Sequence, residues 1–415
     1  MIKGTTFRYL HGRERNLATL QKSIPLVIEP STPAYKTHLK EILSENPEQI
    51  LDEISKHGAV LLRGFDIKSE KDFEQAVLSI KGVRGMNSYF MSESGRTLID
   101  GTDFVFYTNK FIPTGGGLKF GGFHNENVYS TDVPKFICFC CFEKPSLGGE
   151  TGLVDVTNVY EDLNQNLKNK LALKTFHTQT WNAGHIAETY SITIDKVKEI
   201  CSDFGLDCKT TPSGEEIVSL YKPSLIKNET NNRTALITNF SREIPGLHLY
   251  LNSKFRKDYK GWKWVYHQLA WKYPIVGKLG KFRIKSLLNR FKPADLTLPQ
   301  KPTTEVKGIP PSTPLQTPDK MAGIFTNEEM KLVADSMYTH FSSFTWEKGD
   351  LLILDNLRIA HGGMPGLGSR VIRALLCNPI KIDVSPKSPG CQDAKENIDQ
   401  QSLSEMIAAL TVSGT

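Results

Sequence analysis

The chain has 415 residues, of which 39% are hydrophobic and 23% charged, and its mean hydropathy is -0.31. These values are typical of a globular protein and exclude disordered, collagen-like and fibrous chains. No apolar run reaches the roughly 20 residues that a membrane span requires, and the N-terminus lacks the apolar core of a secretory signal. We therefore expect a cytoplasmic protein without a membrane span.

The seven cysteines do not form the pattern of a disulfide framework. Cys138, Cys140 and Cys141 fall within the apolar run FICFCCF, where successive side chains of a strand point to opposite faces. Three close cysteines could bind a metal, but the sequence contains no CxxC pair. We favour buried free thiols over ligation.

The N-terminal part predicts a helix followed by a strand. The helix begins at Asn46-Pro47, with Asn46 as the cap and Pro47 in the first turn, and it ends at Gly58. The continuous apolar run 59–65 has the length of a buried strand.

From 98 to 160 the sequence changes to short strand-like runs separated by glycine turns at 115–117 and 148–149. Repeated short strands indicate a sandwich or barrel. Strands are predicted over 104–107, 135–142, 234–240, 350–354 and 370–377, and helices over 158–172 and 192–203.

The segment 246–320 interrupts this pattern. Residues 251–300 hold twelve Lys or Arg against two acidic residues, and a Pro-rich stretch follows them. We expect one domain over 1–385, with its core at about 59–245 and 321–380, a basic aromatic insertion over 246–320, and a polar tail over 386–415. The insertion could be a lid over an anionic substrate, a peripheral contact for a membrane or acidic partner over 251–292, or a packed element with a solvated basic face.

The clearest chemical pattern is the segment FHNE at 123–126. In an extended segment, His124 and Glu126 project to the same side and can bind one ion. A distant histidine would complete a facial triad of two histidines and one carboxylate, which binds Fe(II) and leaves coordination positions open. His361 is the best candidate, because it follows the predicted strand at 351–356 and precedes Gly362-Gly363.

Two further residues suit an anionic cofactor. Arg370 lies nine residues after His361, and its planar guanidinium can bind a carboxylate through two parallel hydrogen bonds. Thr151 follows the 148–149 turn and could share that carboxylate. Each has an ordinary alternative, a strand-edge arginine and a turn threonine, but their order along the chain with the triad favours one cofactor site.

Four strings resemble the taurine dioxygenase (TauD/TfdA) family of Fe(II)/2-oxoglutarate oxygenases. They are HGAVLLRGFDI (57–67), FHNENVYS (123–130), PKFICFCCFEKPSLGGET (134–151) and WEKGDLLILDNLRIAHGG (346–363). The likeness is strongest to the clavaminate synthase-like branch, which has Glu in the first metal motif. It covers most of 40–380, without the insertion and the tail.

The resemblance implies an α+β fold, a double-stranded β-helix (jelly roll) with flanking helices. It implies Fe(II) and 2-oxoglutarate as cofactors, with O2 as cosubstrate. It also implies that His124, Glu126 and His361 ligate the iron, and that Thr151 and Arg370 bind the distal carboxylate of 2-oxoglutarate.

The segment after His361 departs from the family pattern. Relatives often continue with Arg and then an aromatic residue, where this chain has Gly363 and Leu367. The spacing to the 2-oxoglutarate arginine varies in the family, so Arg373 competes with Arg370. Strand alternation puts the two arginines on opposite faces unless a bulge intervenes, and Arg370 fits the short-loop spacing better.

The resemblance further implies that 2-oxoglutarate is converted to succinate and CO2 while a substrate C–H bond is oxidised, by hydroxylation, desaturation or ring closure. Glu126 argues against halogenation, because halogenating relatives lose this carboxylate. We expect a small amino-acid-derived carboxylate substrate from specialised-metabolite biosynthesis. Candidate substrate contacts, each with a solvated surface role as its alternative, are Arg96, Asn109, Lys110 and Arg373.

Two other functions stay open at this point. One is a non-catalytic jelly-roll protein that binds a membrane or an acidic partner through the insertion. The other is a zinc hydrolase with the same three ligands, which leaves Arg370 and Thr151 without a role. Nucleic-acid binding is disfavoured, because the basic and aromatic residues lie in one insertion and match no recognised binding motif. The oligomeric state cannot be inferred.

Overall fold

The structure is a computed structural model, and it describes most of the chain. The described residues are 2–17, 19–86, 98–108, 120–128, 132–172, 175–190, 192–203, 206–228, 233–237, 245–273 and 325–381. Several predicted features lie outside them, namely Arg96, Asn109, Lys110, the turn at 115–117, most of the insertion (274–320) and the tail at 386–415.

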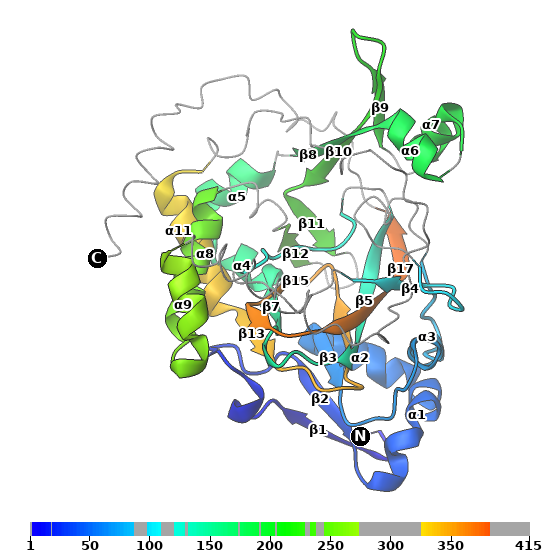
Figure 1. The fold of residues 1–415 in the computed structure, drawn as a ribbon, viewed down its shortest axis with the longest axis vertical. Helices are drawn as coiled ribbons and strands as arrows, with labels where there is room; N and C mark the ends of the chain where they lie inside the picture. The colour runs from blue at the N-terminus through cyan, green and yellow to red at the C-terminus, as the bar shows by residue number, and fades with distance from the viewer. Residues whose placement is uncertain are drawn as a thin grey trace, which may run out of the picture.

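A seven-stranded sheet forms the centre of the molecule (Figure 1). Its spatial order is β1-β2-β3-β14-β5-β17-β4, so strands from both ends of the chain alternate as neighbours. All pairs are antiparallel except β2 and β3. The strands are β1 (Thr5–Tyr9), β2 (Leu26–Pro30), β3 (Ala59–Leu62), β4 (Val105–Tyr107), β5 (Asp132–Glu143), β14 (Leu351–Asp355) and β17 (Val371–Lys381).

A smaller sheet of order β13-β7-β15 faces the large one. Side chains of the two sheets share one buried cluster, in which Leu153 and Phe344 meet Ile137 and Leu352. Two antiparallel sheets closed over a common apolar layer form a jelly roll, so the predicted α+β jelly-roll fold is confirmed. The smaller strands are β7 (Thr151–Asp155), β13 (Phe341–Phe344) and β15 (Ile359–Gly363), with the short pair β6 (Leu147–Gly148) and β16 (Gly366–Leu367) beside them.

Three N-terminal helices cover the outer face of the large sheet. Ile54 and Phe73 from these helices pack with Val60 and with Cys138 and Cys140 of β5. Cys141 points the other way, into the cluster between the sheets, and all three thiols are buried and free as predicted. The helices are α1 (Leu39–Glu45), α2 (Pro47–His57) and α3 (Glu70–Leu78).

Helix α2 has the predicted bounds, but its predicted cap is wrong. Gly58 ends the helix with a φ of 76°, a left-handed conformation that glycine adopts without steric cost. Asn46 makes no side-chain cap to α2, and its Nδ2 donates to the carbonyl of Ile42 at 2.9 Å. Because α1 directly precedes α2, the last carbonyls of α1 take this donor.

Two other elements are shorter than predicted. The strand expected over 59–65 ends at Leu62, because Gly64 has a φ of 83° and redirects the chain. The helix expected over 158–172 is split into α4 (Val156–Asp162) and α5 (Gln165–Ala172). Leu163 is extended between them, and the Asn164 side chain accepts from the Leu167 amide at 2.8 Å to begin the second helix.

The described part of the insertion packs on the core. Leu251 and Phe255 of α8 lie in one buried cluster with Phe123 and Phe341. In Figure 1, α8 runs beside α11, where Tyr338 donates to Asp258 at 2.6 Å. The predicted basic helices are therefore confirmed over 245–273 as α8 (Pro245–Asp258), the short η5 (Trp262–Trp264) and α9 (Val265–Lys272), followed after the gap by α11 (Asn327–Thr339).

The remaining elements lie in the upper part and at the centre of the view in Figure 1. None of the helices that the structure describes is both long and apolar enough to cross a membrane. These elements are β8 (Thr175–Asn182), α6 (Ala183–Tyr190), α7 (Ile194–Asp203), β9 (Asp207–Thr210), β10 (Glu216–Pro223), β11 (Leu225–Asn228) and β12 (Arg233–Leu236).

Candidate metal centre and cofactor anchor

Backbone pairing brings the two predicted histidine ligands together. The amide of His124 donates to the carbonyl of His361 at 2.9 Å, and the amide of His361 donates back to His124 at 2.9 Å. This antiparallel bridge joins the extended segment before Glu126 to the middle of β15. The two imidazole rings consequently lie with their centroids 4.3 Å apart.

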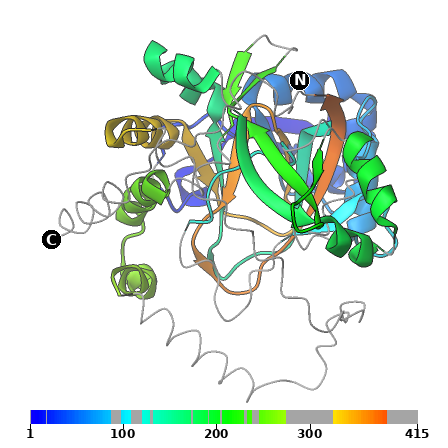
Figure 2. The same cartoon turned by 90° about the horizontal axis from the view of Figure 1, so that it is seen from above.

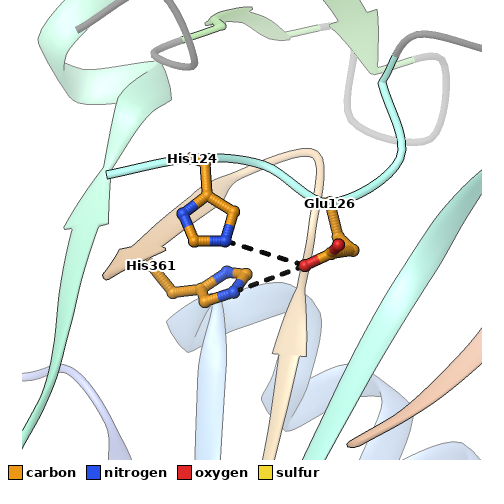
Figure 3. A group of neighbouring side chains, drawn as sticks. All are labelled: His124, Glu126 and His361. Carbon is orange, nitrogen blue, oxygen red and sulfur yellow. Dashed lines mark ion pairs between the residues drawn. The ribbon is translucent and has the colours of Figure 1, made fainter. Parts of the chain in front are cut away.

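Glu126 completes the group. Its Oε2 lies 3.7 Å from Nε2 of His124 and 3.8 Å from Nε2 of His361 (Figure 3). One ligand atom from each of the three side chains lies within 4.8 Å of the others. Two imidazoles and one carboxylate are the donor set of a facial Fe(II) site, so these residues fit the metal that the sequence indicates.

The centre is more open on one side than on the other. The His361 side chain is 6% exposed and packs against Phe139 of β5 at 5.0 Å between ring centroids. The His124 side chain is 23% exposed. The His124 side of the cluster is therefore more exposed to solvent than the His361 side, against which β5 packs.

Buried asparagines hold the Glu126 backbone in place, and sequence reasoning missed them. Asn356 accepts from the Glu126 amide at 2.7 Å, and it donates to the carbonyls of Glu126 at 3.0 Å and Pro134 at 2.9 Å. Asn125 donates to the Asn356 carbonyl at 2.6 Å. The sequence signal that could have found Asn356 is its position directly after the buried run LLILD at 351–355.

The predicted cofactor anchor forms where two turns meet. The pairing of β16 with β6 lays the chain before Arg370 along the 148–149 turn. Arg370 is half-buried, and its Nη1 donates to the carbonyl of Gly149 at 2.8 Å. Thr151 begins β7 two residues further on, and its Oγ1 accepts from Nε1 of Trp346 at 3.2 Å. Arg370 and Thr151 thus flank one turn.

Arg373 lies elsewhere. Its Nε donates to Oε1 of Glu70 in α3 at 3.0 Å, and its guanidinium lies 4.7 Å above the ring of Tyr107. A register shift between Val371 and Ile372 marks the bulge that separates it from Arg370. The structure therefore brings Arg370, and not Arg373, to the turn that carries Thr151.

Beside Arg370 the anchor contains a buried acid, Glu150, that sequence reasoning did not single out. Burial lowers the pKa of Arg370 to about 10, against the opposing influence of Cys141 and Glu150. Burial raises the pKa of Glu150 to about 7, although Asn16 donates to its Oε1 at 2.5 Å. The motif GGET contains Glu150, whereas nothing in the sequence marks Asn16 as its partner. A desolvated cation at this place favours binding of an anion.

Comparison with known proteins gives the family. Residues 28–260 match the family described as "Taurine catabolism dioxygenase TauD, TfdA family". The chain belongs to this family. The predicted membership is confirmed, and the chain is accordingly an Fe(II)- and 2-oxoglutarate-dependent dioxygenase, as predicted. Both the non-catalytic interpretation and the zinc-hydrolase interpretation are thereby wrong.

Individual relatives of the dioxygenase are distant in sequence. The chain is 22% identical over 371 residues to the dapdiamide synthesis protein DdaC of Enterobacter agglomerans, and the alignment covers 88% of this chain and 95% of that protein. Among solved structures, PvcB of Pseudomonas aeruginosa has a TM-score of 0.46 and 12% identity, covering 90% of this chain and 91% of that one. A taurine dioxygenase from Burkholderia xenovorans has a TM-score of 0.41 and 12% identity, covering 92% of this chain and 99% of that one.

Proposed function

We propose that the dioxygenase oxidises a small amino-acid-derived carboxylate by hydroxylation, desaturation or oxidative ring closure, in the biosynthesis of a specialised metabolite. In this proposal His124, Glu126 and His361 hold Fe(II), and Thr151 and Arg370 bind the distal carboxylate of 2-oxoglutarate. The observation that carries it is the convergence of the three ligand atoms within 4.8 Å of one another.

When bound, Fe(II) would activate O2 for oxidation of a substrate C–H bond, with 2-oxoglutarate as the co-reductant that is converted to succinate and CO2. The chain's own residues position the reactants. The Gly149 carbonyl holds the guanidinium of Arg370 at one edge. Trp346 donates to Thr151, so the hydroxyl hydrogen of Thr151 is directed away from that donor and is available to an anion.

Glu126 restricts the outcome of the reaction. Three protein ligands are present, so no coordination position is vacated for a halide by loss of a carboxylate. This supports oxygenation, desaturation or ring closure over halogenation. The name of the DdaC relative, a dapdiamide synthesis protein, supports a substrate from specialised metabolism. Arg373 is paired with Glu70 on the outer side of the sheet and has no place in this proposal.

Anaerobic titration of the purified protein tests the cofactor site. Addition of Fe(II) and then 2-oxoglutarate is expected to produce a weak visible charge-transfer band. The matched control is His38→Ala, an exposed histidine remote from the cluster, which should behave like the unmodified protein. A band of unchanged intensity in His361→Ala would contradict the ligand assignment.

Product analysis tests the substrate class. The protein, with both cofactors and air, is incubated with a panel of carboxylated amino-acid derivatives, and products are analysed by mass spectrometry. Gain of one oxygen indicates hydroxylation, and loss of two hydrogens indicates desaturation or ring closure. A chlorinated product that depends on chloride would contradict the role of Glu126. The corresponding amines without a carboxylate are incubated in parallel, and turnover of these amines alone would contradict the substrate class.

A further inference from the structure

An apolar stripe lies on the outer side of η5 and α9. Trp262, Val265, Leu269 and Tyr273 are 82%, 51%, 44% and 49% exposed. Val265 and Leu269 lie one turn apart on the same side of α9. Trp262 lies in η5 directly before α9, and Tyr273 directly follows its end. We refer to these four residues as the α9 stripe.

The inner side of the same helix is also apolar, and it is already packed. Trp264 and His267 are buried, and the Trp264 ring lies 4.3 Å from the ring of Tyr259 between centroids. A Cβ atom on Gly148 would come within 2.5 Å of the Trp264 side chain, so η5, which leads directly into α9, rests on the turn before Thr151. The α9 stripe is therefore not needed to attach the helix to the core.

The concentration of exposed apolar residues here is unusual. Of the nine large hydrophobic residues exposed in the described part of the chain, four form the α9 stripe. Single exposed hydrophobic residues are normal on protein surfaces, whereas contiguous apolar patches mark sites of interaction. Figures 1 and 2 both show α9 at the outer edge of the described part of the molecule.

Positive charge surrounds the stripe. Lys257, Lys260, Lys263 and Lys272 are all exposed, and Nζ of Lys272 lies 5.5 Å from the ring centroid of Tyr273. The sequence from 259 to 294 contains nine Lys or Arg and no Asp or Glu. A surface that combines exposed Trp and Tyr with long basic side chains complements a layer of anionic headgroups above hydrocarbon.

We propose that the α9 stripe docks the dioxygenase reversibly onto an anionic lipid surface. Trp262 and Leu269 enter the headgroup boundary, and the neighbouring lysines contact anionic headgroups. The proposal does not depend on the identity of the substrate or on the cofactor assignments, because it rests on the surface of α9 alone.

Vesicle co-sedimentation of the full chain tests this proposal. Binding is expected to vesicles containing phosphatidylglycerol and not to vesicles of phosphatidylcholine alone, and it should weaken as salt is raised. The variant Trp262→Ser/Leu269→Ser should weaken partitioning by at least about tenfold, from the loss of buried apolar area. Lys263→Glu/Lys272→Glu should also weaken binding to the vesicles that contain phosphatidylglycerol.

Ile194→Ser in α7 is the matched control, because it removes an exposed hydrophobic residue far along the chain from the stripe. It should leave vesicle binding unchanged, and all variants should retain succinate formation in solution. Three results would overturn the proposal. The first is equal vesicle binding by Trp262→Ser/Leu269→Ser and the unmodified protein. The second is self-association of the unmodified protein that this variant abolishes. The third is binding of the unmodified protein to an acidic carrier protein but not to vesicles.

Discussion

His361 of the metal-ligand cluster and Thr151 of the carboxylate anchor lie on neighbouring strands of the small sheet, β15 and β7, yet the two sites are stabilised in different ways. The cluster is held by neutral hydrogen bonds, through the backbone bridge between His124 and His361 and the contacts of Asn356 with Glu126. The anchor combines a half-buried cation, Arg370, with a fully buried acid, Glu150.

This difference has an energetic consequence. Neutral buried hydrogen bonds position a group at little net cost when every partner is satisfied. A half-buried cation and a buried acid are costly to desolvate, and an incoming carboxylate offsets part of that cost. Changes in the first region should therefore act on metal affinity, and changes in the second on 2-oxoglutarate affinity and on pH dependence.

The largest effect is expected for His361→Ala. Loss of one of three protein ligands should abolish Fe(II) binding and turnover, because two ligands do not hold the metal in a facial site. The iron content of the protein after gel filtration measures Fe(II) binding, and the rate of succinate formation measures turnover. Retention of stoichiometric iron with full activity would remove His361 from the site.

The anchor is tested by Arg370→Lys. An ammonium cannot reproduce the planar guanidinium, so 2-oxoglutarate binding should weaken by about 1.5–3 kcal/mol, with Fe(II) binding unchanged. Arg373→Lys is the matched control, since Arg373 pairs with Glu70 away from the turn. The KM for 2-oxoglutarate distinguishes them, and a larger effect of the Arg373 variant would transfer the role to it.

The support of the cluster is tested by Asn356→Leu. This change keeps the volume and removes the contacts that fix Glu126, and losses of ligand support typically cost about 10- to 100-fold in metal affinity. Fe(II) titration should show the loss, whereas 2-oxoglutarate binding at saturating metal should change little. Unchanged Fe(II) affinity in a folded variant would show that the sheets alone position Glu126.

The smallest effect on turnover is expected at Glu150, where the consequence is pH-dependent stability. Folding raises the pKa of this carboxyl from about 4.5 to about 7, so between these pH values the folded chain binds a proton that the unfolded chain does not. The free energy of unfolding of the cofactor-free protein should therefore fall as pH rises through this window.

Glu150→Gln cannot ionise and should lose this dependence. Relative to the unmodified protein, the variant should gain on the order of 1–3 kcal/mol of stability between about pH 5 and about pH 8, measured by urea unfolding. Glu347→Gln, which changes a half-exposed glutamate outside the anchor, is the control. A stability difference that is the same at both pH values would show that Glu150 is ionised throughout.

Local sequence determined the elements whose signals are short-range. Proline at the start and glycine after the end defined α2, and the continuous apolar runs predicted β5 and β14. The types of ligand were also readable, because His124 and Glu126 alternate along one extended segment. These features depend on backbone dihedral angles and side-chain alternation, which neighbouring residues set.

The tertiary structure alone decided which distant groups meet. The backbone bridge places His361 beside His124, and the β16–β6 pairing brings Arg370 to the turn before Thr151. The Asn46 side chain donates a hydrogen bond to the end of α1 and does not cap α2 as predicted. No local sequence pattern predicts the hydrogen bond between Asn16 and Glu150 or the exposure of the α9 stripe. The physical reason is that strand pairing and burial depend on packing between remote segments, which periodicity within one segment does not encode.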